Sequence, residues 1–232
     1  MDFRSIIFIL ICFSRLNSQW LSFDLSEADV VTFKKQVEPT IISVAISGGQ
    51  STMLNLTQNQ RFGITFSIPM GWDLSLSSYE SNPLLNPLML EGQVLVTENL
   101  VLIGKMNIFS NSKETINAAG YGCNFISDSW ATNISMGWLE GPTHLRVRYV
   151  DSSIIGKRTL AKVPILLGVG YNNYRGSIKG FDNIDIPKSI DNSISYLITG
   201  TELIIEGVNV ELQVRLNSKF FQFNFTIFHL FF

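Results

Sequence analysis

The sequence predicts an all-β protein built from many short strands. Runs of β-branched and aromatic residues recur along the chain, as in Thr40–Ile46, Arg61–Ile68 and Leu145–Val150. Gly, Pro, Asn, Asp and Ser are concentrated between these runs, and no long segment repeats its apolar residues with a helical period. Short strands separated by turn residues are typical of an antiparallel sandwich or barrel.

The expected elements follow the chain in order. Two segments, Leu25–Lys34 and Lys113–Ala119, are the candidates for short helices. The expected strands are Thr40–Ile46, Arg61–Ile68, Gln93–Val96, Leu100–Ile103, Ile134–Leu139, His144–Val150, Val163–Val169, Ser177–Ile184, Ile194–Ile198, Glu202–Glu206 and Asn209–Leu216.

One strand has a pattern that also predicts its facing. Leu145, Val147 and Tyr149 alternate with Arg146 and Arg148. Because successive side chains of a strand point to opposite faces, the apolar set is expected to be buried and the two arginines exposed.

The beginning of the chain has the layout of a secretory signal peptide. Residues 1–19 place Arg4 before an apolar run, Ile6–Phe13, and polar residues follow. The run is too short for a transmembrane helix, which needs about 20 residues, so no transmembrane span is expected. The alternative is a buried first strand. A signal peptide predicts processing near residues 17–20 and a secreted or extracellular protein.

The last residues, 217–232, are apolar and aromatic and are left unassigned. Phe221, Phe223 and Phe225 would share one face of a final strand over Phe220–Ile227. A truncated chain end is the alternative.

Composition excludes several classes of protein. The 232 residues contain 17 Lys and Arg against 19 Asp and Glu, a net charge of −2, and 46% of them are hydrophobic. Charged residues make up 16%, below the roughly 25% of an average globular domain. This excludes an intrinsically disordered chain and a strongly basic nucleic-acid-binding protein.

Two further features fit an extracellular protein. Asn55, Asn133 and Asn224 begin acceptor triplets for N-glycosylation. Cys123 would be the only cysteine left after removal of the signal peptide. It could form an intermolecular disulfide, or it could be a small buried apolar residue.

Three stretches carry a resemblance to a known family. Phe62–Pro69 is similar to an early strand whose aromatic residues enter the core, Trp138–Asp151 to a strand with Trp and His that ends in a turn, and Pro164–Ile184 to a closing pattern. Over residues 20–216 the chain resembles the laminin-G-like, concanavalin-A-like jelly-roll domains. The resemblance implies an antiparallel two-sheet β-sandwich with Trp138 in its core, and members that bind glycans or proteins.

An enzyme is not expected. No strand offers the two convergent carboxylates of a glycosidase, and the sequence lacks nucleophile-elbow, phosphate-loop and zinc-binding motifs. We therefore expect no catalytic residues and no organic cofactor.

Calcium is the one metal considered. Laminin-G-like domains often hold calcium at the rim of the sandwich, and four residues in turns or strand ends offer oxygen ligands. Ordinary turn chemistry is the alternative for these residues. They are Asp151, Asp182, Asn183 and Asp185.

A basic cluster and two tryptophans are the candidate ligand-binding residues. Basic side chains within 17 positions would gather into one patch if the segment after Asp151 returned as a hairpin. Guanidinium groups in such a patch could pair with sulfated or carboxylated glycans, and an exposed tryptophan could stack on a sugar ring. Solvated surface residues and packing residues are the alternatives. The candidates are Arg146, Arg148, Lys157, Arg158, Lys162, Trp72 and Trp130.

Together these features predict a non-catalytic recognition or adhesion module at the cell exterior, binding glycan or an extracellular protein. The alternatives are a structural or assembly domain of a larger cell-surface protein, and a glycan-active enzyme.

Overall fold

The computed structural model describes residues 30–74, 84–85, 88–107, 117–141, 145–161, 163–178, 189–205 and 207–231. The elements within them are the helix α2 (Val30–Gly49) and the strands β1 (Phe62–Asp73), β2 (Leu84–Leu85), β3 (Met89–Leu95), β4 (Leu100–Asn107), β5 (Asn117–Ile126), β6 (Trp130–Glu140), β7 (Leu145–Leu160), β8 (Val163–Ile178), β9 (Ser189–Ile205), β10 (Val208–Asn217) and β11 (Phe220–Phe231).

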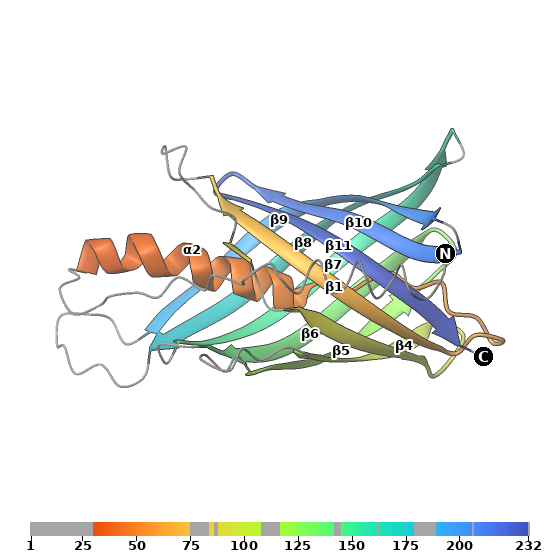
Figure 1. Cartoon of the computed structure of the whole chain (residues 1–232), viewed down its shortest axis with the longest axis horizontal. Coiled ribbons are helices and arrows are strands. Elements are labelled where there is room, and N and C mark those ends of the chain that lie inside the picture. The colour runs from red at the N-terminus through yellow and green to blue at the C-terminus, as the bar shows by residue number, and fades with distance from the viewer. Residues whose placement is uncertain are drawn as a thin grey trace.

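The strands form a closed antiparallel barrel. Every strand except β2 pairs with its neighbours in chain order, and β1 pairs with β3 on one side and with β11 on the other. The seam runs from Phe62 opposite Phe231 to Asp73 opposite Phe220, so ten strands close the wall (Figure 1). The short strand β2 adds two pairs beside Met70 and Gly71 of β1.

The predicted two-sheet jelly-roll sandwich, and with it the laminin-G-like resemblance, is wrong. A sandwich keeps two separate sheets with edges, whereas here one sheet closes on itself. Both architectures are built from strands of period two, and the strand pattern alone does not distinguish them. The unassigned segment 217–232 supplies the closing strand β11.

The C-terminal part of the helix α2 lies inside the barrel, and its start projects beyond the strands at one end (Figure 1). It contacts β1 and β11 on one side and β6, β7 and β8 on the opposite side, and Figure 1 shows it running along the barrel. The expected strand Thr40–Ile46 is therefore helix. Its β-branched residues favour a strand locally, but packing inside the barrel overrides that preference. Within the described residues, no helix is long and apolar enough to cross a membrane.

The core of the molecule is the lumen of the barrel, filled by α2 and the irregular segment 50–56, which we call the plug (residues 30–56). The body of α2 packs against inward-facing residues of the wall, such as Val147 and Tyr174. Beyond the helix, Met53 packs against Leu166 and Ile198, while Leu54 and Leu56 form a separate apolar cluster with Leu95, Val101 and Ile103.

The two ends of the barrel differ. At the short-turn end, consecutive strands are joined by residues 96–99, 127–129, 161–162 and 206–207. At the long-loop end, the connections include residues 74–88, 108–116 and 179–188. The helix enters at the long-loop end, where Ile41 lies beside Gly176, and Leu54 lies beside Gly63 at the short-turn end. The plug therefore traverses the lumen before the chain returns as β1.

Candidate functional site

Polar side chains line the inside of the wall. On strand after strand the fully buried positions include charged or amide residues, and these alternate with exposed or half-buried apolar residues. The buried polar wall residues are Thr65, Glu91, Gln93, Lys105, Asn124, Asn133, Ser135, Asp151, Ser153, Asn172, Glu211, Gln213, Arg215, Gln222, Asn224 and Thr226.

The end of α2 is held by donors from the wall. The last carbonyl groups of a helix have no partner within the helix and carry the negative end of its dipole, so buried cations and amides satisfy them. The donors are Asn172 Nδ2 to Ala45 O (3.1 Å), Arg215 to Ile46 O (3.0 Å), Lys105 Nζ to Gly48 O (3.1 Å) and to Gln50 O, and Ser135 Oγ to Gly49 O (2.9 Å).

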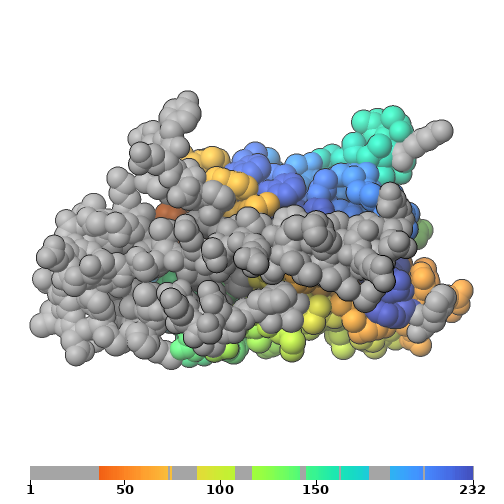
Figure 2. Space-filling view, in the orientation of Figure 1, coloured from red at the N-terminus to blue at the C-terminus, as the bar shows by residue number. Residues whose placement is uncertain are grey.

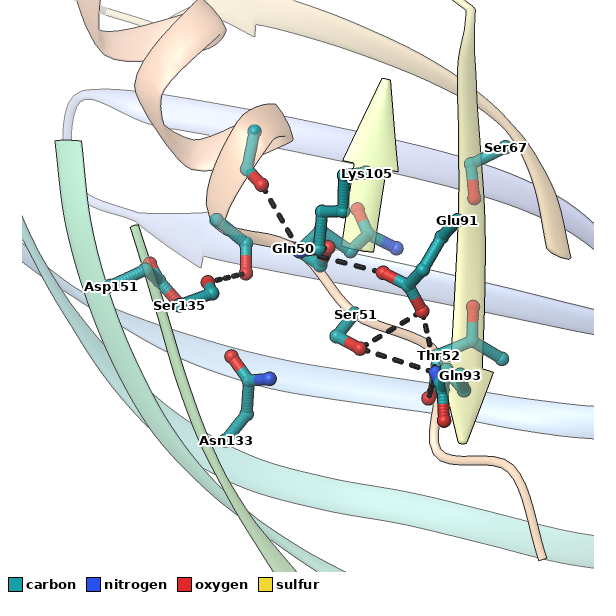
Figure 3. A network of polar contacts seen from close by, with 12 residues as sticks. Gln50, Ser51, Thr52, Ser67, Glu91, Gln93, Lys105, Asn133, Ser135 and Asp151 are labelled. Atoms are coloured by element: carbon teal, nitrogen blue, oxygen red, sulfur yellow. Dashed lines mark hydrogen bonds and ion pairs between the residues drawn. The ribbon is translucent and has the colours of Figure 1, made fainter. Parts of the chain in front are cut away.

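A first buried ion pair joins β3 and β4 to the plug. Lys105 Nζ lies 3.5 Å from a carboxylate oxygen of Glu91. Glu91 also accepts hydrogen bonds from Ser51 Oγ at 3.0 Å and from Gln93 Nε2 at 2.5 Å (Figure 3). Gln93 in turn donates to the carbonyl oxygen of Thr52 at 2.7 Å. The two opposite charges therefore neutralise each other on the wall. Glu91 and its neighbour Gln93 also hydrogen-bond to Ser51 and Thr52, which follow the helix.

A second buried ion pair lies across the lumen. Arg215 NH1 is 3.8 Å from Asp151 Oδ2, and the guanidinium lies 4.9 Å from the centre of the Tyr196 ring. Asp151 Oδ2 accepts from Tyr196 OH at 2.7 Å and from Asn172 Nδ2 at 2.8 Å. Buried charges are tolerated when they are paired and hydrogen-bonded in this way. The two ion pairs, Lys105–Glu91 and Arg215–Asp151, and their hydrogen-bond partners form a polar band that holds the plug at the middle of the lumen.

The outer surface of the barrel carries many exposed large apolar residues, alongside exposed polar residues such as Ser152, Asn173 and Ser195. Neighbouring outward residues in the middle of β7, β8 and β9 are Ile154, Val169 and Leu197, which are 55%, 55% and 60% exposed. Where they are visible in Figure 2, side chains of β1 (orange) lie beside those of the C-terminal strands (blue), in agreement with the pairing of β1 with β11. The other exposed large apolar residues on barrel strands are Phe62, Val94, Leu102, Met106, Tyr121, Phe125, Trp130, Ile134, Met136, Val150, Leu160, Val163, Leu167, Tyr171, Ile204, Ile205, Leu216 and Phe231.

Two tryptophans mark the ends of this apolar surface on one strand. Trp130 is at the short-turn end of β6, and Trp138 is near its long-loop end. Eight residues of strand separate them by about 26 Å. Trp138, expected in the core, is half-buried on the outer face. The expectation of no transmembrane span considered only a helix, and the apolar outer wall of the barrel corrects it.

The predicted basic patch is not assembled. Arg146 and Arg148 lie at the long-loop end of β7, and Lys157 and Arg158 at the other end, about 33 Å away along an extended strand. Residues 145–160 form one continuous strand and the hairpin turn comes later, so the expected return after Asp151 is wrong. Lys157 pairs with Glu202 at 2.5 Å. Lys162 lies outside the described residues.

The predicted facing of β7 agrees with the structure. Leu145, Val147 and Tyr149 are buried, Arg148 is exposed and Arg146 is half-buried. The buried set packs on the plug instead of on a second sheet.

The two candidate tryptophans do not share a cleft. Trp72 is at the long-loop end of β1 and packs on Phe221, with ring centres 5.3 Å apart. Trp130 is 45% exposed at the opposite end of the barrel. The structure places them on different parts of the wall.

Of the four candidate calcium ligands, only Asp151 lies within the described residues. Asp151 is fully buried and pairs with Arg215. Asp182, Asn183 and Asp185 lie outside the described ranges. No group of three or more His, Cys, Asp and Glu that could hold a metal ion occurs in the part of the chain that the structure describes.

The remaining candidates are distributed over both faces of the wall. Asn133 and Asn224 are buried toward the lumen, where the folded barrel does not present them for glycosylation, whereas Asn55 is exposed. Cys123 is a free thiol, half-buried on the outer face of β5. Residues 1–19, the expected signal peptide, lie outside the described residues.

The sequence interpretation missed the lumen residues. The sequence does contain a signal for these lumen residues, because polar and apolar residues alternate in the last two strands. In β10 the polar residues Glu211, Gln213 and Arg215 occupy every second position. Gln222 and Asn224 do the same in β11. Such alternation, with the polar set on one face, predicts a strand with one polar and one apolar side.

Comparison with known proteins gives structural resemblances without a family. No family model matches the chain, and no curated protein matches it. The attachment invasion locus protein Ail of Yersinia pestis is 11% identical, covering 73% of this chain and 94% of that one, with a TM-score of 0.29. The translocator domain of the autotransporter NalP from Neisseria meningitidis is 7% identical, covering 85% and 95%, with a TM-score of 0.39.

A third resemblance is to the KdgM porin, 9% identical, covering 73% of this chain and 99% of that one, with a TM-score of 0.33. All three are outer-membrane β-barrels. The assignment of a barrel to this chain rests on its own strand register, which is continuous around the wall.

Proposed function

We propose that this chain is an integral membrane β-barrel, a structural domain that anchors a cell-surface protein in an outer-membrane-type bilayer. The observation that carries the proposal is the distribution of side chains, with polar and charged residues buried inside and large apolar residues exposed outside. A water-soluble protein has the opposite distribution. Transmembrane β-barrels alternate apolar residues facing lipid with polar residues facing the lumen.

Two further properties of the wall support a position in the bilayer. A closed barrel satisfies all wall backbone hydrogen bonds between neighbouring strands, as a structure without access to water requires. The long connections at one end and the short turns at the other also match the usual asymmetry of such barrels.

The filled lumen favours an anchor over an open channel. The plug packs in apolar layers on either side of the polar band, with Val147 and Tyr174 in one and Leu166 and Ile198 in the other. Solutes would have to displace both layers and the donors that hold the end of α2. The proposal thus replaces the glycan-binding module with the structural alternative that the sequence also offered.

The proposal is tested by reconstitution of the full chain into liposomes. We expect the protein to resist extraction with alkaline carbonate, and lipids brominated along their acyl chains to quench its tryptophan fluorescence. In planar bilayers we expect no steady conductance. A monodisperse protein that stays in the aqueous supernatant without detergent would contradict membrane insertion, and a steady open conductance would contradict the anchor.

A further inference from the structure

Three arginines gather on the outer wall near the long-loop end. Arg148 of β7 and Arg175 of β8 are direct cross-strand partners, and both are exposed. Arg146 is two residues nearer the end of β7, on the same face. Trp138 is the partner of Arg148 on the other side, and the guanidinium of Arg146 lies 5.9 Å from the Trp138 ring.

The positive charge of this cluster is only partly compensated. Like charges directly opposite one another destabilise a strand pair. Arg175 forms an ion pair with Asp191 at 3.3 Å, but these side chains are 62% and 56% exposed, so the pair is weak. Glu140 stands opposite Arg146 in the register. Nε of Arg146 is buried and has no hydrogen-bond partner.

The cluster sits at the boundary of the apolar wall. The next outward residue on β7 is Val150, 49% exposed, and Ser152 and then Ile154, 55% exposed, follow toward the middle of the strand. Tryptophans in membrane proteins lie at the level of the lipid headgroups, and Trp138 is beside the arginines. In the orientation of the proposed function, the three guanidinium groups therefore lie at the headgroup level of one leaflet.

We propose that Arg146, Arg148 and Arg175 bind the phosphate of an anionic membrane lipid, whose acyl chains lie on the apolar wall below. This inference rests on the proposed function. Planar guanidinium groups pair bidentately with phosphate oxygens, and a phosphate between Arg148 and Arg175 would relieve their repulsion.

The opposite end of the barrel supplies a matched control. Arg158 is also exposed on β7, but it faces Ile165 across the strand pair, and the adjacent Lys157 is already paired with Glu202. Arg158→Gln removes one outer arginine without touching the cluster.

The test measures lipid retention by native mass spectrometry of the full chain in detergent, with phosphatidylglycerol and phosphatidylcholine of identical acyl chains. We expect the wild type to prefer phosphatidylglycerol by about tenfold, since charged hydrogen bonds are the strong ones. The variant Arg148→Gln/Arg175→Gln should lose that preference, and Arg158→Gln should keep it. Arg148→Lys/Arg175→Lys, which keeps the charge without the planar fork, should fall between them.

Several results would overturn the proposal. They are a wild type without preference, a loss in Arg158→Gln equal to that in the double variant, or displacement of the lipid by millimolar inorganic phosphate, which would mark a free-anion site. Failure of the double variant to fold, seen by circular dichroism, leaves the lysine variant and the wild-type preference to decide. Membrane insertion of the wild type, measured separately, shows whether the proposed function stands when the lipid preference fails.

Discussion

Arg215 is the largest fully buried side chain in the described part of the chain, and its position shows how a charge is accommodated in the lumen. Its guanidinium donates to Ile46 O at the end of α2, to Tyr196 OH and, through Nε, to Gln213. Asp151 balances the charge at 3.8 Å. Removing one member of such a pair is costly because the other remains charged and buried.

At the residue scale we expect Asp151→Asn to lower the free energy of unfolding by about 3–5 kcal/mol, because it leaves Arg215 without its counter-charge. Urea denaturation in detergent micelles measures this. The double variant Asp151→Asn/Arg215→Met should lose less than the sum of the two single changes. Arg158→Gln, at an exposed site, should stay within about 0.5 kcal/mol of the wild type. Equal stability of Asp151→Asn and this control would show that the pair does not support the fold.

At the scale of single elements, the alternation of the strands could be predicted and the direction of its two faces could not. The alternation of Arg61–Ile68 places Phe62, Ile64, Phe66 and Ile68 on one face. Ile68 is buried, but Phe62 is 37% exposed, and Thr65 on the other face is fully buried. An alternation with period two shows that the two faces of a strand differ. It does not show whether water, lipid or a plug lies against each face.

The helical plug could not be predicted from the local sequence, for a different reason. Thr40–Ile46 is rich in β-branched residues, and only its enclosure by strands far away in the sequence makes it helical. The lumen contacts of Lys105 and Arg215 with the helix end join residues more than fifty positions apart. No residue spacing in the sequence predicts these contacts.

A disulfide tests the position of the helix. A Cβ built at Gly71 of β1 would lie 2.3 Å from Ser43 Oγ of α2, so Ser43→Cys and Gly71→Cys should form a bond on oxidation. In a chain with Cys12 and Cys123 changed to serine, we expect a mobility shift on non-reducing gels. The pair Ser43→Cys and Gly104→Cys should not cross-link, because a Cβ at Gly104 meets nothing within 4 Å. Absence of the first bond would contradict a helix in the lumen.

At the scale of the whole molecule, the barrel is a wall that separates two environments, and substitutions on its outer face should depend on depth. We expect Leu197→Arg, at the middle of β9, to cost about 2–4 kcal/mol in a bilayer. Leu160→Arg, at the short-turn end of β7, should cost about 0–1 kcal/mol because the charge reaches water.

Reversible unfolding of each variant in lipid vesicles gives both values. Equal costs at the two depths would mean that the outer wall does not lie in hydrocarbon. The comparison is independent of the lumen, because both side chains point outward and are 60% and 66% exposed.

The seam between β1 and β11 joins the first strand of the barrel to the last, so its formation must wait for the end of the chain. Residues that are distant in sequence pay the largest loop-closure entropy before their contacts form, which makes folding slow. The plug precedes β1 and is enclosed by the finished wall, so α2 has to be in place before the seam closes. Refolding should therefore be limited by a late step in which Phe220–Phe231 zips onto β1, and a chain shortened before that strand should remain open-edged and prone to pair with other copies.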